Sequence, residues 1–359
     1  MNKRITLPKW YDLHVHVRQG PAMEAYIAAH LSMGCAGILA MPNTKPPVAK
    51  IRTSDPLPYW SVEEYRDMIL KAGGNAFSTV ITPLYLTKDT TPAMIEAGVK
   101  SGLLKACKYY PPHGTTNADH GRPLRDLMDN GVIKALEDNG VILCLHGEEH
   151  ALSGEQYFGR NSNAEDYFYR ERMPRLRNQH PNLKMVCEHI TTKTAADFVE
   201  KSGDKTGATI TPQHLLYTMG DLVQGLKYHL YCLPLVKFEE DRQALLSVVR
   251  KSGNTRFFAG TDSAPHTTKA TECGCAAGCF TGGIAPQLYA ESFDLEHDLE
   301  IFKAFLCTNG ANFYGLPVPI ETFDMVYKDM DLEPLDTKDG NVLPLPLGLG
   351  QKTLRWSIA

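Results

Sequence analysis

The sequence predicts a (β/α)8 barrel, in which eight parallel strands close into a ring and helices cover the outside. Short apolar segments rich in β-branched residues alternate with longer segments whose apolar residues recur at helical spacing, and eight such strand candidates occur. The competing layout, an open doubly wound sheet, usually carries a glycine-rich phosphate-binding motif after its first strand, and none follows here. The barrel is therefore the better prediction.

The predicted elements alternate through most of the chain. We expect one domain over residues 1–359, with the barrel over residues 10–315, a short N-terminal addition and a C-terminal extension over residues 316–359. Amphipathic helices are expected over residues 62–71, 124–139, 165–179 and 242–251. Strands are expected over residues 11–17, 35–41, 77–85, 103–109, 141–146, 183–189, 208–211 and 256–261.

The composition is that of an ordinary globular protein. Of the 359 residues, 43% are hydrophobic and 22% are charged, and the net charge is -4. A nucleic-acid-binding surface normally needs a basic excess, which is absent here. No apolar run is long enough to span a bilayer, and the N-terminal segment lacks the apolar core of a signal peptide. We expect a cytoplasmic protein that binds neither nucleic acid nor membrane.

The nine cysteines indicate reduced thiols. Most of them lie inside apolar strand-like runs, where a thiol behaves as a small core side chain. The exception is the dense cluster of Cys273, Cys275 and Cys279, which invites a structural zinc interpretation. A second pair of ligands at matching spacing is missing, and small residues surround the thiols. We favour a tight loop whose backbone amides approach a ligand.

A histidine pair in the first predicted strand is the first indication of chemistry. His14 and His16 are two residues apart, so both imidazoles should leave the strand on one face, where they can hold a divalent metal. Arg18 has the same parity, follows the expected end of the strand and suits the binding of a carboxylate. An isolated pair of this kind is also typical of a strand that faces water.

The ends of the other predicted strands favour the metal site. Active sites of β/α barrels lie at the C-terminal ends of the strands. Each polar residue there has a structural explanation of its own, such as a hydrogen-bonded core histidine or a capping carboxylate. Five of the eight predicted strands carry a candidate ligand or bridging group at this end, and such convergence indicates a shared site. The strand-end residues are His14, His16, Asn43, Lys108, His146, His189 and Asp262.

These residues lie within long motifs that occur in a fixed order. The motifs are DLHVHVR, MPNTKPP, CKYYPPHGTTNADHG, LHGE, EHITTK, ATITPQHLLY, HLYCLPLVK, GTDSAPH, CGCAAGCF and NGANFYGLP. Together they resemble the dihydroorotases of the single-function, class II type, within the amidohydrolase superfamily. The resemblance extends from Asp12 to Pro317 and returns weakly at residues 353–357. It implies a zinc-dependent enzyme that reversibly cyclises N-carbamoyl-L-aspartate to L-dihydroorotate in UMP biosynthesis.

The resemblance also implies a binuclear metal site in the mouth of the barrel, with two zinc ions per subunit. One ion would be held by His14, His16 and Asp262, and the other by His146 and His189. A hydroxide between the ions would attack the ring amide carbonyl, because metal binding lowers the pKa of water. Asp262 would take the proton of this hydroxide and pass it to the departing amide nitrogen, so that one carboxylate serves as ligand, base and acid.

Lys108 would bridge both ions as an N6-carboxylated lysine. An ammonium group between two cations is repelled, whereas the carbamate formed with carbon dioxide is an anion with two oxygen ligands. A buried lysine is more readily neutral and can therefore react. Lysines in barrels can instead form a Schiff base with a carbonyl substrate. A crystal structure with unmodified Lys108 and no metals beside it would overturn the assignment.

The resemblance assigns the substrate carboxylate to Arg18 and Asn43. His266 and backbone groups of the CGCAAGC loop would complete the pocket. This loop has one residue more than the family pattern CGCAGCF, so the backbone contact falls to Ala276 or Ala277 and both remain open.

A polar segment directly after Lys108, PPHGTTNADHG, is a candidate lid over the barrel mouth. By resemblance, Thr115 and Thr116 would hydrogen-bond the bound substrate, and the main chain of Leu233 would contact its ring. His113 and His120 could indicate a further metal, but histidines in a polar loop are more often solvated, and we treat them as structural.

Three other functions remain open. A related cyclic-amide hydrolase acting on hydantoins or allantoin would share the metal site and differ in the pocket. A metal-dependent deaminase generally manages with one metal and no bridging lysine. A non-catalytic scaffold on the same barrel has no reason to keep a full set of ligands. The family also implies a small-molecule substrate and a homodimer.

Overall fold

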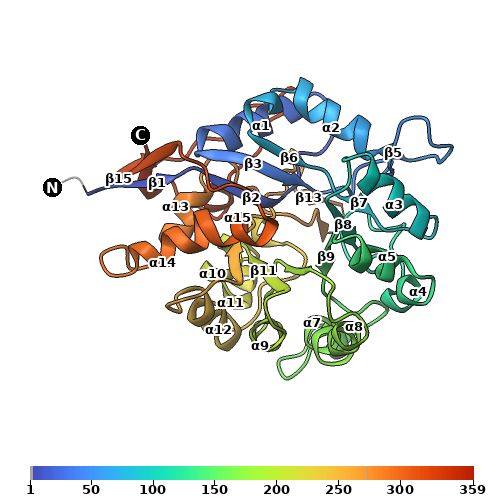
Figure 1. Cartoon of the computed structure of the whole chain (residues 1–359). Helices are drawn as coiled ribbons and strands as arrows, with labels where there is room; N and C mark the ends of the chain where they lie inside the picture. Colours follow the sequence, from blue (N-terminus) through green and yellow to red (C-terminus); the bar gives the residue numbers. More distant parts are fainter. Residues whose placement is uncertain (1–2, 273) are drawn as a thin grey trace.

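The computed structural model describes residues 3–272 and 274–359. Short parallel strands occupy its centre and helices surround them, and the colours run round this centre in sequence order (Figure 1). One sheet has the order β12-β11-β10-β9-β8-β7 and a second has the order β2-β3-β6. These strands are β2 (Trp10–Val15), β3 (Cys35–Ala40), β6 (Thr79–Ile81), β7 (Leu84–Tyr85), β8 (Ala106–Tyr109), β9 (Ile142–His146), β10 (Met185–Glu188), β11 (Thr206–Ile210) and β12 (Phe257–Ala259).

Two connections join these sheets into a ring. β6 and β7 belong to one extended segment that is interrupted at Pro83, which has no N–H to donate to a neighbouring strand. On the opposite side, the N–H of Asp262 donates to the carbonyl of His14 at 2.8 Å, and the N–H of His16 donates to Ser263 at 3.0 Å. The first and last strands are thereby paired in parallel beyond β12. The predicted (β/α)8 barrel is confirmed.

Several predicted strands differ in their limits from those in the structure, and two differences bear on the site and on the ring. The first strand was expected to reach residue 17 but ends at Val15, and the segment 77–85 contains β6 and β7 instead of one strand. Beyond three of the barrel strands the chain turns sharply, with positive φ angles of 57° at Arg18, 39° at His189 and 48° at Asp262. Non-glycine residues adopt this conformation only where the surroundings hold them, and such residues cluster at functional sites.

The predicted helices are present, most of them with altered limits. α2 matches its expected range and begins with a capping box between Ser61 and Glu64. The expected helix 124–139 is two helices, because Asn130 and Gly131 separate them and Gly131 has a φ of 81°. The helices are α1 (Met23–Ser32), α2 (Val62–Lys71), α3 (Pro92–Lys100), α4 (Leu124–Asp129), α5 (Val132–Asp138), α6 (Gly154–Tyr157), α7 (Ala164–Tyr167), α8 (Met173–Gln179), α9 (Lys193–Lys201), α10 (Pro212–Leu216), α11 (Met219–Val223), α12 (Glu239–Val249), α13 (Ala285–Ala290), α14 (Leu299–Lys303), α15 (Asn309–Tyr314) and α16 (Leu345–Gly348).

Four short helical turns complete this set. A π-helical turn, η2 (Phe168–Arg172), connects α7 to α8 within the helix expected over residues 165–179, and another, η4 (Ala304–Thr308), connects α14 to α15. The 3-10 turns are η1 (Gly74–Ala76) and η3 (Tyr228–Leu230). Within the described residues, no helix combines the length and the apolar content needed to cross a bilayer.

A small antiparallel sheet joins the two ends of the chain. It has the order β1 (Arg4–Pro8), β15 (Thr322–Asp331) and β16 (Thr353–Ile358), and it lies beside both termini (Figure 1). Leu7, Met325 and Trp356 are buried in the same hydrophobic cluster as the helices and strands of the barrel. The C-terminal extension, for which the sequence suggested no role, thus pairs with the N-terminal strand and packs on the barrel. Two short pairs lie elsewhere, β4 (Val48–Lys50) with β5 (Trp60–Ser61) and β13 (Ala270–Thr271) with β14 (Gly274–Cys275).

Candidate metal and substrate site

Two histidines and a carboxylate meet where the first and last barrel strands join. The possible ligand atoms of His14, His16 and Asp262 all lie within 4.8 Å of one another, and all three residues are buried. Asp262 Oδ1 lies 2.9 Å from His16 Nε2 and 3.4 Å from His14 Nε2. Burial opposes the ionisation of Asp262, but the hydrogen bond with His16, helped by the neighbouring His14, outweighs it and lowers the pKa of Asp262. A carboxylate beside two imidazoles is a donor set that suits a divalent cation.

Glu188, which the sequence analysis missed, orients His14. Its Oε2 atom lies 2.6 Å from His14 Nδ1 and also accepts a hydrogen bond of 2.6 Å from the Thr209 hydroxyl. Burial, helped by the nearby Lys108, lowers the pKa of His14 well below its usual value. The neutral imidazole therefore places its proton on Nδ1, toward Glu188, and its lone pair on Nε2, toward Asp262. Glu188 directly precedes His189 in the EHITTK motif, but the sequence gives no sign that it contacts His14.

The remaining predicted ligands lie next to this cluster. The ring of His189 lies 4.8 Å from that of His14 and 4.8 Å from that of His146, measured between centroids. His146 Nε2 lies 2.8 Å from a carboxylate oxygen of Glu148, and His189 Nδ1 is buried without a hydrogen-bond partner among the described residues. The three histidines thus form a continuous row from β2 to β9.

Lys108 is the most unusual group in the barrel mouth. Its side chain is fully buried, and its Nζ atom has no hydrogen-bond partner among the described residues. It lies 5.0 Å from the centroid of the Tyr110 ring. Burial lowers the pKa of Lys108, although the nearby Glu188 raises it. A buried ammonium without a partner is costly, so this position suits an amine that is neutral or chemically modified. Together with the unpartnered His189 nitrogen, it fits a site that holds metal.

Arg18 reaches the same mouth, but not by strand alternation. β2 ends three residues before it, and the left-handed turn at Arg18 redirects the chain. Its Nη2 atom lies 3.1 Å from His266 Nε2, which in turn lies 2.8 Å from the carbonyl oxygen of Ala277. Burial, reinforced by Arg18, lowers the pKa of His266 to about 3, so this imidazole is neutral. When its Nε2–H donates to Ala277, the guanidinium donors remain available to an anion.

The cysteine-rich loop is a short hairpin at the edge of the mouth. The N–H of Ala276 donates to the Lys269 carbonyl at 2.8 Å, so this amide belongs to the pairing of the hairpin. The partly exposed Ala277 lies beside His266, and the partly exposed Leu233 directly precedes Pro234. The eight cysteines that the structure describes are free, and Cys273, part of the predicted cluster, lies outside the described residues.

The segment 111–121 is held against Asn43. The side-chain amide of Asn43 donates to the Thr116 carbonyl at 2.9 Å, and that of Asn117 donates to the Asn43 carbonyl at 2.9 Å. The Asn43 side-chain oxygen is buried without a hydrogen-bond partner among the described residues. Thr115 and Thr116 are partly exposed.

The two histidines of the same segment are exposed. His113 Nδ1 lies 3.4 Å from a carboxylate oxygen of Asp119, and both side chains are largely in solvent. His120 is exposed and packs its ring edge-on against Tyr59, with centroids 5.5 Å apart. Neither arrangement resembles the buried histidine row of the barrel mouth.

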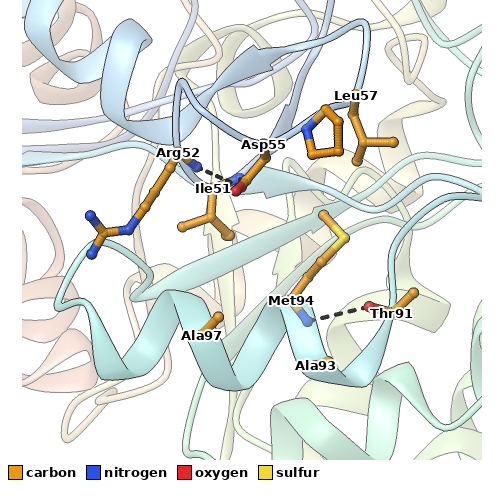
Figure 2. Close-up of a pocket in the computed structure, with 9 residues that line it drawn as sticks. Ile51, Arg52, Asp55, Leu57, Thr91, Ala93, Met94 and Ala97 are labelled. Carbon is orange, nitrogen blue, oxygen red and sulfur yellow. Dashed lines mark hydrogen bonds between the residues drawn. The ribbon is translucent and has the colours of Figure 1, made fainter.

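An apolar pocket of about 390 Å³ lies away from this mouth, between α3 and the segment that follows β4. Figure 2 shows Met94 of α3 facing Leu57 across it, with Asp55 tied back to the amide of Arg52. No residue of the histidine row or of the Arg18 site lines this pocket, so it does not compete as the catalytic centre.

Comparison with known proteins identifies the family. The chain is 38% identical over 360 residues to the dihydroorotase of Halorhodospira halophila, and the alignment covers 99% of this chain and 98% of the relative. It is 39% identical to the dihydroorotase of Cupriavidus metallidurans, with 99% of each chain covered. The chain belongs to the dihydroorotase family. No family model matches it.

Solved structures of two dihydroorotases share the fold over nearly their full length, and a hydantoinase shares it over most of its length. A crystal structure of dihydroorotase from Saccharomyces cerevisiae in complex with 5-fluoroorotic acid has a TM-score of 0.86 and 28% identity, covering 99% of this chain and 98% of that one. The dihydroorotase of Campylobacter jejuni has a TM-score of 0.84 and 26% identity, covering 100% and 98%. A D-hydantoinase from a Thermus species shares the fold at a TM-score of 0.75 and 14% identity, covering 99% and 82%.

Proposed function

We propose that this chain is a dihydroorotase, a hydrolase of cyclic amides that interconverts N-carbamoyl-L-aspartate and L-dihydroorotate in pyrimidine biosynthesis. The observation that carries the proposal is the buried cluster of His14, His16 and Asp262 in a member of this family, with Arg18 in the same barrel mouth. The cluster suits the hydrolysis of an amide, and the guanidinium suits the carboxylate that both compounds carry.

The metal complement that we propose is two zinc ions. His14, His16 and Asp262 would hold one ion and His146 and His189 the other, with Lys108 as a bridging carbamate. Zinc would supply a Lewis acid that polarises the amide carbonyl and lowers the pKa of water. His146 would have to exchange its contact with Glu148 for the metal, whereas Lys108 Nζ and His189 Nδ1 have no hydrogen-bond partner to give up within residues 3–272 and 274–359.

Asp262 would move the proton. Its low pKa keeps it ionised at neutral pH, and its Oδ1 atom lies at the centre of the cluster. In the hydrolytic direction it accepts the proton of the attacking water and delivers it to the ring nitrogen as the amide bond breaks. Ring closure uses the same steps in reverse. The fixed backbone turn at Asp262 keeps the carboxylate in place during both transfers.

Arg18 would bind the substrate carboxylate, with Asn43, His266 and the main chain of Leu233 and of the hairpin around it. Of the two hairpin residues left open by the sequence, we propose Ala277 for the backbone contact, because the Ala276 amide is already engaged. Exchange of Arg18 for methionine removes a charge-assisted hydrogen bond. We expect kcat/KM for dihydroorotate to fall about 10- to 100-fold.

Hydantoin, a cyclic amide that lacks the carboxylate, is the matched probe for this substitution. The kcat/KM for hydantoin is expected to be small in the wild type, and it should be unchanged by Arg18→Met, because the lost interaction does not involve the reacting amide. Steady-state kinetics with both compounds measure the effect. An unchanged KM and kcat for dihydroorotate in Arg18→Met would contradict the carboxylate assignment.

Thr115 and Thr116 would bind substrate when the segment 111–121 covers the mouth. Removing both hydroxyls in a Thr115→Val, Thr116→Val variant should lower kcat for dihydroorotate about 30-fold, since each of the two neutral hydrogen bonds contributes about 1 kcal/mol. The metal content should stay at the wild-type level because neither hydroxyl belongs to the ligand set. Kinetics and metal analysis of the same preparation measure the two quantities, and a loss of metal without a loss of kcat would refute the assignment.

The activity itself is tested by supplying zinc and bicarbonate to purified protein and following both directions of the reaction. We expect ring opening of dihydroorotate and ring closure of N-carbamoyl-L-aspartate, with little turnover of hydantoin or allantoin. A preference for hydantoin would favour the second candidate, a hydantoinase-like enzyme, whose fold this chain shares. Metal binding without any turnover would favour a scaffold. We further propose one domain over residues 1–359 and a cytoplasmic location. We also propose a homodimer, and sedimentation of the pure protein tests this oligomeric state.

A further inference from the structure

A buried carboxylate outside the proposed ligand set holds the turn that carries His189. Glu165 lies in α7, and its side chain is almost fully buried. Its Oε1 atom accepts hydrogen bonds from the amides of Thr191 at 2.8 Å and Thr192 at 3.0 Å, and from the Thr192 hydroxyl at 3.1 Å. Its Oε2 atom accepts from the Thr191 hydroxyl. One side chain thus binds two consecutive residues through four donors.

The turn that Glu165 binds is also secured at its start by β11, and at its end Thr192 caps α9 by accepting a hydrogen bond from the Ala195 amide at 3.2 Å. The N–H of His189 donates to the Thr209 hydroxyl at 2.7 Å, and that of Ile190 donates to the Thr209 carbonyl at 3.2 Å. The next two amides belong to Glu165. All four amides from residue 189 to 192 are therefore occupied, two by β11 and two by this carboxylate. The chain needs such restraint here, because His189 has a φ of 39°.

Glu165 is itself held at a fixed point. Asn163 caps α7 by accepting hydrogen bonds from the amides of Glu165 and Asp166, each at 3.0 Å. Burial raises the pKa of Glu165 to about 7, against the influence of the nearby Lys237. Burying a carboxylate costs free energy, and its four hydrogen bonds here all go to one turn. This indicates that the conformation of that turn must be fixed.

We propose that Glu165 is a positioning residue, which fixes residues 189–192 and thereby aims the His189 imidazole at the metal site. The inference rests on the proposed function only in taking His189 as a metal ligand. It assigns to α7, which contributes no ligand, control over one half of the site.

Glu137 provides a matched control at the other end of the same strand. Its carboxylate accepts from the Asn182 amide at 2.7 Å and lies 3.1 Å from His180 Nδ1, in the connection that precedes β10. Removal of Glu137 should therefore destabilise the entry to β10 without moving His189. Comparison of substitutions at Glu165 and Glu137 therefore separates a general loss of stability from a change in the orientation of His189.

The test measures metal binding directly, in Glu165→Ala, Glu165→Gln and Glu137→Ala. Each protein is stripped of metal and titrated with zinc in the presence of bicarbonate, and cobalt spectra report the ligand geometry. We expect Glu165→Ala to bind one of its two ions about 10- to 100-fold more weakly, as is usual when a group that orients a ligand is lost. Glu165→Gln keeps an oxygen for both amides and should recover most of the affinity. Glu137→Ala should bind both ions as the wild type does.

Equal affinity for both ions in Glu165→Ala and the wild type would overturn the proposal, as would an equal loss in Glu137→Ala. If Glu165→Ala does not fold, Glu165→Asp decides, because it keeps the charge but draws it away from the turn. Unaltered binding of both ions by folded Glu165→Asp would then overturn the proposal. The proposed function fails separately, if wild-type protein loaded with two ions does not turn over dihydroorotate.

Discussion

Exchange of Asp262 for alanine is expected to abolish dihydroorotase turnover in both directions. The proposal gives this carboxylate two tasks, ligation of metal together with His14 and His16, and transfer of the proton between water and the ring nitrogen. Loss of the general acid and base alone should cost roughly 1,000-fold in kcat. The same group serves both directions, so the ratio of forward to reverse rates should not change. Rates for both directions and zinc content, measured on one preparation, check this expectation.

Asp262→Asn separates the two tasks. The amide keeps the shape of the side chain and one oxygen, but it cannot accept the proton. We therefore expect zinc to be retained more fully in Asp262→Asn than in Asp262→Ala, while turnover is lost in both. Substantial activity in either variant, with both ions present, would rule out Asp262 as the proton carrier.

Exchange of Lys108 for methionine should lower kcat roughly 1,000-fold, because a group that bridges two cations supplies several kcal/mol of charge stabilisation. Methionine is unbranched and flexible like lysine but carries no charge, so the fold should persist. The reaction of Lys108 with carbon dioxide needs the neutral amine. Burial lowers the pKa of Lys108, so the neutral form is present at a lower pH than for an exposed lysine. Carbamate formation should thus extend to a lower pH than for an exposed lysine.

Bicarbonate dependence distinguishes this chemistry from a Schiff base. Wild-type protein, stripped of metal in buffer free of carbon dioxide, should regain two zinc ions only after bicarbonate is added. Lys108→Met should not respond to bicarbonate. Trapping of a substrate carbonyl on Lys108 by borohydride, with no requirement for bicarbonate, would refute the bridging carbamate.

Local sequence rules predicted much of the barrel, but they did not predict the points at which the structure differs from that prediction. Alternation of apolar segments was enough to locate the strands, and the His14–His16 spacing was enough to suggest a shared face. The break in the helix over residues 124–139 was missed, although Asn-Gly is a strong turn signal. The position of Arg18 could not be predicted, since it depends on a left-handed turn beyond β2 and not on parity.

Contacts between distant segments were the part that the sequence could not reveal. Glu188 contacts His14 across 174 residues, and Glu165 contacts residues 26 and 27 positions away, so no periodic pattern links them. The sheet formed by the two chain ends left a weak trace in the alternating Ile5 and Leu7. Its partner strand begins at Thr322, and pairing across such a separation is decided by tertiary packing.

The metal cluster lies on the seam at which the barrel closes. The hydrogen bond from Asp262 to His14 that joins the first strand to the last also sets two proposed ligands side by side. A nascent chain can therefore build this cluster only after the ribosome has released residue 262, when most of the polypeptide is already synthesised. An ion bound there would stabilise the closed barrel, because the first strand could not separate from the last without loss of the bound ion.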